Sequence, residues 1–252
     1  MRSELEVIEP EWAAPVPARV RCAFTLRTGG VSATPHDSLN VGAHVGDVGA
    51  AVEENRRRVG ERLRLPGEPV WLQQVHGVGV VELGAAPSAE GEFARADAAV
   101  TRVRGRVCVI QVADCMPVLF AARDGSAVGA AHAGWRGLAG GVLEETVRHL
   151  GVPAAEIIAW LGPTISQDHF EVGDEVREAF VSDDLGAAAA FSPNARGRWQ
   201  CDLYSLARRR LVALGIRDIS GGGWCTYGDA ARFFSYRRDG QCGRMAALIW
   251  ME

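Results

Sequence analysis

The segment ADCMPVLFAARDGSAVGAAHAGWRG, residues 113–137, contains the side chains whose spacing best suits chemistry. An Asp-Gly dipeptide between its two apolar runs predicts a tight β-hairpin. With a two-residue turn, Pro117 faces His132, and Cys115 lies two residues further along the same face. Diagonal neighbours lie about 7–8 Å apart, so a zinc ion bound about 2.3 Å from sulfur and about 2.1 Å from nitrogen could bridge them. The spacing therefore permits one metal ion shared by Cys115 and His132.

A third candidate ligand is His76, which lies in QQVHGVGV at an apparent tight turn between two further strands. A single histidine in a turn is usually only solvated, and a single buried cysteine is usually an inert thiol. The other four histidines, His36, His44, His149 and His169, lack comparable settings.

The composition describes an ordinary globular protein of 252 residues with a formal charge of −4 and 48% hydrophobic residues. All 27 cationic side chains are arginines, so lysine Schiff-base and Walker-A chemistry are excluded, and arginine must bind any anion. The mild acidic balance gives no support for binding nucleic acid or an anionic membrane.

The N-terminal sequence MRSELEVIEPEW carries acids and a proline where a signal peptide needs an apolar core, and we expect a cytoplasmic protein. The six cysteines form no C-x-x-C pair and are predicted to be free thiols. A chain of this length buries enough surface to fold without a metal, so any metal ion would serve function.

Periodicity predicts an α+β fold, with residues 1–252 forming a single domain of mixed β-sheets flanked by helices. The segments 83–93 and 183–198 are predicted to be surface loops. The predicted helices are 51–63, 138–150, 172–180 and 202–214, the last with Asp202 as a plausible N-cap. The predicted strands are 20–27, 69–75, 79–83, 106–112, 117–123, 126–132, 156–162 and 244–250.

Several long blocks in the same order carry a resemblance to one bacterial family. The blocks are RTGGVS, SLNVGAHVGD, QVHG, ADCMPVLF, AHAGWRG, LGPTIS with FEVGDEV, and FFSYRRDGQCGRMAALIW. They resemble the peptidoglycan editing factor / purine nucleoside phosphorylase family, formerly called multicopper polyphenol oxidase (laccase). The likeness implies a single metal-dependent enzyme domain with zinc held by His76, Cys115 and His132, the three positions that the local spacing also indicates.

The resemblance implies phosphorolysis of adenosine, inosine and guanosine, with methylthioadenosine phosphorolysis and adenosine deamination beside it. The partners would be purine nucleosides and phosphate. The phosphate would be held by arginine, because the chain has no lysine. The candidates are Arg27, Arg136, and Arg237 or Arg238 for phosphate, Asn40 for ribose or base, Asp114 as base or orienting group, and Trp135, Phe170 and Tyr236 for stacking on the purine.

Two histidines and one thiolate leave a fourth position of a tetrahedral zinc open, as in catalytic sites, and the same donors could bind copper. A laccase with a trinuclear copper cluster needs several His-x-His pairs. The chain has six histidines and no such pair. The zinc-deaminase signature of H-x-E with P-C-x-x-C is also missing.

Three alternatives stay open at this point. The same zinc could serve an editing factor with amidase-type chemistry on muropeptides that carry a wrong first amino acid. Cys115 could instead act without metal as a thiolate nucleophile, with His132 as its base, in a Cys-His hydrolase. Finally, the zinc could be structural, although a closed site needs four ligands and three are visible.

Overall fold

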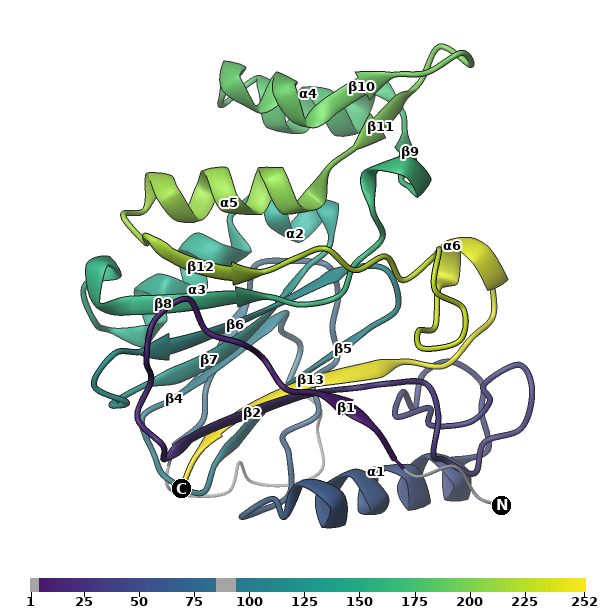
Figure 1. Ribbon diagram of the computed structural model, residues 1–252, viewed down its shortest axis with the longest axis vertical. Helices are drawn as coiled ribbons and strands as arrows, with labels where there is room; N and C mark the ends of the chain where they lie inside the picture. The colour runs from purple at the N-terminus through teal and green to yellow at the C-terminus, as the bar shows by residue number, and fades with distance from the viewer. Residues whose placement is uncertain (1–4, 85–93) are drawn as a thin grey trace.

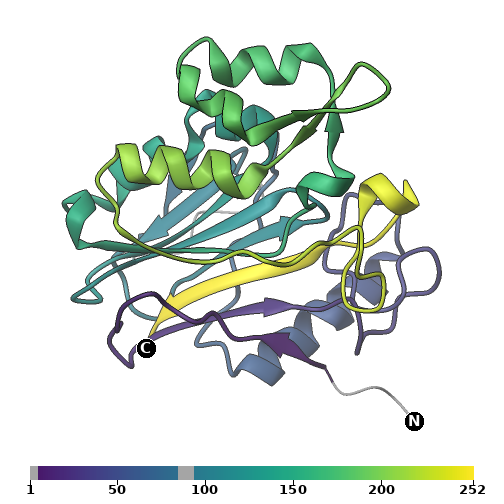
Figure 2. The same ribbon diagram turned by 45° about the horizontal axis from the view of Figure 1, so that its top comes forward.

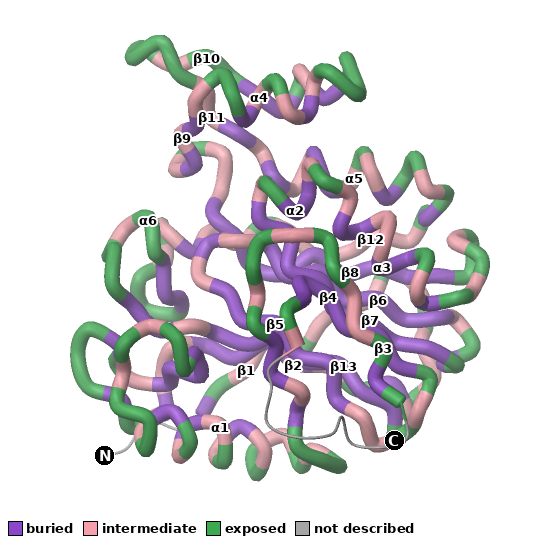
Figure 3. Tube along the Cα trace, turned by 180° about the vertical axis from the view of Figure 1, so that it is seen from behind, coloured by how far each residue is buried: buried purple, intermediate pink, exposed green. Residues whose placement is uncertain are grey.

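The computed structural model describes residues 5–84 and 94–252. Two β-sheets pack face to face at its centre, and helices cover the outer side of each (Figure 1). Figure 3 shows buried residues concentrated in the strands and exposed residues on turns and outer helix faces. The arrangement confirms the predicted α+β fold with mixed sheets and flanking helices.

The first sheet is antiparallel and brings together strands from both ends of the chain. Side chains alternate along its central strand: Leu248 and Trp250 pack in one cluster with Val59 of a covering helix, whereas Ala247 and Ile249 face the second sheet. Burial on both faces explains why this strand is a continuous apolar run. In spatial order the strands are β1 (Val7–Ile8), β2 (Val20–Thr25), β13 (Met245–Met251) and β5 (Val107–Val112), and the covering helix is α1 (Gly49–Leu63).

The second sheet is mixed, with parallel pairs at both edges and antiparallel pairs between them. Val118 and Phe120 pack under the helices on its outer face, while Leu119 and Ala121 pack against the first sheet. In spatial order the strands are β12 (Asp218–Gly221), β8 (Ile157–Leu161), β6 (Met116–Ala122), β7 (Val128–Ala133), β4 (Ala98–Thr101) and β3 (Val80–Glu82). The helices on this side are α2 (Trp135–Gly140), α3 (Val142–Leu150) and α5 (Leu203–Ala213).

A small third sheet lies beyond α5, where it packs with a further helix (Figures 1 and 2). It contains β10 (Phe191–Pro193), β11 (Trp199–Cys201) and β9 (Glu171–Val172), with helix α4 (Asp174–Val181) and the 3-10 helix η3 (Leu185–Ala190). The remaining short helices are η1 (Ala154–Glu156), η2 (Gln167–His169) and α6 (Tyr236–Asp239).

Most predicted elements are present with small shifts at their ends. The predicted N-cap of α5 is confirmed, because the carboxylate of Asp202 accepts the backbone N–H of Ser205 at 3.1 Å. The predicted helix over 138–150 is wrong as a single element. Gly141 adopts a φ of +99°, ends α2 and starts α3, and an L side chain would strain this conformation.

Two other predictions need correction. The predicted strand 69–75 forms only isolated bridges at Val70 and Gln73, because the Gln74 side chain bonds both the N–H and the C=O of Gln111. The predicted loop 183–198 contains η3 and β10 instead. The alanines of η3 pack in the same core cluster as Phe180. The composition of the segment resembles that of a loop and did not indicate this packing. Most of the predicted loop 83–93 lies outside the described residues.

Candidate metal centre

The β6–β7 hairpin places Cys115 and His132 as the spacing predicts. Pro117 pairs with His132 in the ladder, and Cys115 directly precedes β6. The last ladder hydrogen bond runs from the N–H of Ala122 to the carbonyl of Ala127 at 2.9 Å. The loop therefore holds four residues instead of two, but the predicted register is unchanged.

His76 lies in a turn whose backbone is bound by one carboxylate, that of Asp97. The N–H groups of Val75 and Gly77 donate to Oδ2 at 3.2 and 2.7 Å, and the N–H of His76 donates to Oδ1 at 2.9 Å. His76 has a φ of +60°, a conformation that is unfavourable for a residue with a side chain. The three hydrogen bonds hold this strained turn in place.

Asp97 also orients His132. Nδ1 of His132 lies 2.8 Å from Oδ1 of Asp97, and both side chains are buried. In the neutral imidazole, a carboxylate partner keeps the proton on Nδ1 and leaves the lone pair on Nε2. This is the tautomer that a metal ion bound through Nε2 requires.

The candidate ligand atoms of His76, Cys115 and His132 all lie within 4.8 Å of one another. Nε2 of His76 is 3.8 Å from Sγ of Cys115, and the two imidazole centroids are 4.8 Å apart. Gly134 makes this approach possible. A Cβ at that position would lie 2.9 Å from Sγ of Cys115 and 3.2 Å from Cδ2 of His76.

The electrostatics favour a thiolate at Cys115. Burial would raise the pKa of Cys115, but the charge and hydrogen bonds of His132 and His76 outweigh it and lower the pKa to about 6. Burial would likewise lower the pKa of His132, but the Cys115 thiolate and Asp97 raise it to about 9. For Asp97, hydrogen bonds from His132 and from the His76 turn outweigh burial and hold its pKa below the usual value.

The donor set fits a divalent metal ion. It combines one thiolate with two imidazoles, one of them oriented by a carboxylate, as metal-binding histidines usually are. Three ligands leave one tetrahedral position free. Within residues 5–84 and 94–252, no other group of three or more His, Cys, Asp or Glu side chains lies close enough to share an ion.

The three candidate ligands lie in the wall of a cavity of about 530 Å³. Three arginines line the same cavity, Arg136, Arg237 and Arg244, together with the imidazole of His44. Its aromatic lining consists of Trp135, Phe170 and Tyr236, the three residues predicted from the sequence to stack on the purine. The cavity therefore joins a wall whose donors suit a metal ion to surfaces that suit an anion and a flat ring.

The sequence-predicted residues Arg136 and Arg237 lie in this cavity. The guanidinium of Arg136 stacks 4.4 Å from the ring centroid of Trp135, and that of Arg237 lies 5.3 Å from the ring of Phe170. Nη1 of Arg237 donates to the carbonyl of Glu171 at 2.9 Å. Stacking holds each guanidinium while leaving donors for a ligand.

Asp114 also lines the cavity, but its carboxylate is engaged within the protein. Oδ1 accepts the hydroxyl of Thr226 at 2.6 Å, and Oδ2 accepts the backbone N–H of Arg237 at 2.7 Å. Asp114 has a φ of +87° directly before Cys115. It connects the Cys115 turn to the start of α6. Of the two roles predicted for Asp114, base and orienting group, these contacts suit the orienting group.

Arg27 and Asn40 are not among the described residues that line the cavity. Arg27 donates to the carbonyls of Asp37 and Ala230. The fully buried Asn40 donates to the carboxylate of Asp47 at 2.8 Å and accepts the N–H of Arg244 at 2.8 Å. Both bind neighbouring loops, and Asn40 supports Arg244, which does reach the cavity.

Sequence reasoning missed three residues of the site: Asp97, His44 and Arg244. Asp97 lies in ARADAAV, where no local spacing relates it to a histidine. His44 lies inside the SLNVGAHVGD block, and its place in that block was the signal that could have identified it as a site residue. Burial and the charge of nearby Arg244 lower the pKa of His44, so the neutral imidazole is favoured.

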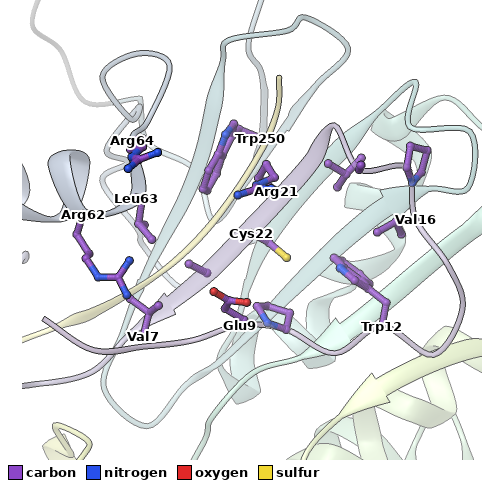
Figure 4. A pocket seen from close by; sticks show the side chains of 15 residues that line it. Val7, Glu9, Trp12, Val16, Arg21, Cys22, Arg62, Leu63, Arg64 and Trp250 are labelled. Atoms are coloured by element: carbon purple, nitrogen blue, oxygen red, sulfur yellow. The ribbon is translucent and has the colours of Figure 1, made fainter.

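A second hollow, of about 540 Å³, lies along β1 and β2 (Figure 4). Trp12, Cys22, Arg62 and Trp250 are among its lining. Cys22 is the single cysteine among the described residues lining it, and none of them is a histidine. This hollow therefore lacks the donor set of the cavity beside Cys115.

The fold and this site define the chain as an α+β protein with a His-Cys-His centre in a cavity. Residues 21–252 match the family described as multi-copper polyphenol oxidoreductase laccase, and the chain belongs to that family. It is 55% identical over 246 residues to a purine nucleoside phosphorylase of Pseudomonas aeruginosa, covering 97% of this chain and 98% of that one.

Two further relatives cover the chain almost completely. Purine nucleoside phosphorylase YfiH of Escherichia coli is 50% identical over 246 residues, with 98% of this chain and 99% of that one covered. A crystal structure of a Neisseria meningitidis protein superposes with a TM-score of 0.92 at 46% identity, covering 98% of this chain and 99% of that one. None of the described helices combines the length and apolar character needed to cross a membrane.

Proposed function

We propose that this chain is a zinc-dependent purine nucleoside phosphorylase acting on adenosine, inosine and guanosine. One observation carries the proposal: the His76, Cys115 and His132 ligands share a cavity of about 530 Å³ with three arginines and three aromatic rings. The names of the relatives from Pseudomonas aeruginosa and Escherichia coli support the same reaction. Bound zinc would supply a Lewis acid next to the substrate, and copper could occupy the same donors.

Phosphorolysis joins a phosphate oxygen to C1′ of the ribose as the bond from C1′ to the purine nitrogen breaks. The purine then leaves with a proton. Arg136, Arg237 and Arg244 are the residues of this cavity that can hold the phosphate through charge-assisted hydrogen bonds. Trp135, Phe170 and Tyr236 offer ring faces to the purine. Asp97 keeps His132 in its orientation, and Asp114 holds the Cys115 turn against α6.

The experiment is a nucleoside screen of the metal-loaded protein with and without phosphate, with products separated by chromatography. We expect free purine and ribose 1-phosphate only when phosphate is present. Methylthioadenosine phosphorolysis and adenosine deamination are proposed side activities, and deamination would release ammonia without phosphate. Purine release that is equally fast without phosphate would contradict the leading proposal.

A second candidate is a metal-free Cys-His hydrolase. The low pKa of Cys115, about 6, favours it because a thiolate beside His132 is a potential nucleophile. Chelation separates the two candidates. Activity that survives complete metal removal and is lost on alkylation of Cys115 would favour the hydrolase.

A further inference from the structure

A second group of reactive side chains lies outside the metal centre, where Cys225 meets Ser166 and His169. Sγ of Cys225 lies 3.4 Å from Nδ1 of His169 and accepts the Ser166 hydroxyl at 3.0 Å. Two backbone N–H groups, those of Ser166 and Gly228, also point at the sulfur at 3.4 and 3.3 Å. The Ser166 hydroxyl and these two N–H groups therefore converge on the sulfur atom beside the imidazole nitrogen.

His169 is held where it can act as the base for this thiol. Its ring stacks on Tyr227 with centroids 4.5 Å apart and planes 22° from parallel, and Nδ1 lies 3.2 Å from the Ser166 hydroxyl. A nucleophile within reach of a base that other groups orient is the usual arrangement of an activated cysteine. Both Cys225 and His169 are partly exposed, so a small reagent can reach them.

The other cysteines lack this combination. Cys108, Cys201 and Cys242 are buried, and burial raises their pKa values. Cys22 is partly exposed like Cys225, but burial of its sulfur raises its pKa to about 12. Cys115 belongs to the metal centre and is shielded when metal is bound.

We propose that Cys225, with His169 as its base, is a second nucleophilic thiol and a site of oxidation by hydroperoxides. His169 takes the thiol proton, and the sulfur attacks one peroxide oxygen as the O–O bond breaks. The sulfur is oxidised to a sulfenic acid, and the peroxide is reduced. With hydrogen peroxide, the departing hydroxide takes the proton from His169 and leaves as water.

The position of Cys225 connects this oxidation to the metal centre. The next residue, Thr226, donates its hydroxyl to Asp114, and Asp114 directly precedes the ligand Cys115. An oxygen on Sγ would occupy space where three donors and the His169 ring now meet. The contacts at Sγ would be disturbed first, and through Thr226 the change would reach Asp114 and the Cys115 turn.

The test exposes the full-length, zinc-loaded protein to limiting hydrogen peroxide, traps sulfenic acid with dimedone, and follows all six cysteines by mass spectrometry. We expect Cys225 to be trapped at least tenfold faster than Cys22, which serves as the internal control. Equal rates at the two cysteines would overturn the proposal. This measurement does not use nucleosides, so it is valid whether or not the proposed phosphorylase activity is found.

Two variants test the role of the base. His169→Phe keeps an aromatic ring against Tyr227 and should lower the trapping rate of Cys225 towards that of Cys22. The matched control is His149→Phe, which changes a partly exposed histidine bound to Glu82 and should leave the rate unchanged. A His169→Phe protein that reacts at the full rate, or an equal loss in both variants, would overturn the assignment of the base. If His169→Phe does not fold, the ratio of Cys225 to Cys22 in the unaltered protein still decides the proposal.

Discussion

Oδ1 of Asp97 lies 2.8 Å from Nδ1 of His132 and also accepts the backbone N–H of His76 at 2.9 Å. One buried carboxylate thus orients one candidate ligand through its side chain and the other through its backbone. His76 and His132 are far apart in sequence, and this shared partner fixes both relative to Cys115. Asp97 is therefore expected to control metal affinity without contacting the metal.

Asp97→Asn should lower zinc affinity about 10–100-fold, the usual effect of removing the partner of a metal-bound histidine. The neutral amide keeps the shape of Asp97 but loses the charge that holds the proton on Nδ1 of His132. Competition with a chromophoric chelator measures the affinity. Asp183→Asn, at an exposed aspartate, is the control and should bind zinc normally. Unchanged affinity in Asp97→Asn would disprove the orienting role.

Alanine at His76, Cys115 or His132 should remove metal and activity together. Two remaining ligands cannot hold zinc with the affinity of three, whereas the layered core does not depend on these side chains. Elemental analysis gives the metal content, and far-ultraviolet circular dichroism checks the fold. A Cys115→Ala protein with stoichiometric metal and full activity would show that the site lies elsewhere.

Arg136→Lys should lower kcat/KM for phosphate about ten- to a hundredfold, corresponding to one lost charge-assisted hydrogen bond of about 1.5–3 kcal/mol. Lysine keeps the charge but loses the planar fork and its stacking on Trp135. Steady-state kinetics with phosphate as the varied substrate measure the change. Arg148→Lys, at an exposed arginine paired with Glu145, should behave like the unaltered enzyme. An equal kcat/KM in both variants would place Arg136 outside the phosphate site.

Asp47→Asn should destabilise the fold by about 1.5–3 kcal/mol near pH 7, because hydrogen bonds to a charged acceptor would be lost. Burial would raise the pKa of Asp47, but hydrogen bonds from Asn40 and Ser32 outweigh it and lower the pKa. A lowered folded-state pKa gives stability that is present above the unfolded value, about 3.9, and is lost as pH falls through the folded value. Urea unfolding of both proteins should therefore show the difference at pH 7 and a narrowing gap below about pH 4. A pH-independent difference would contradict the charged role of Asp47.

Local spacing in the sequence was sufficient to determine one part of the candidate metal centre. The period of two along a β-strand, with an Asp-Gly turn between apolar runs, placed Cys115 and His132 on one face, and the ladder confirms Pro117 opposite His132. The same patterns gave the α+β class and most strands, because burial on both faces of β6 and β13 requires apolar runs. The absence of lysine likewise determined that arginine provides the cationic groups of the cavity.

Tertiary structure alone decided the contacts between distant segments. Asp97 carries no sequence signal, because its partners His76 and His132 reach it only when β4 pairs with β7 beside the His76 turn. Arg244 lines the cavity, and its backbone N–H donates to Asn40, 204 residues away. Hydrogen bonds between distant segments depend on how the sheets pack, and no periodicity within one segment records that packing.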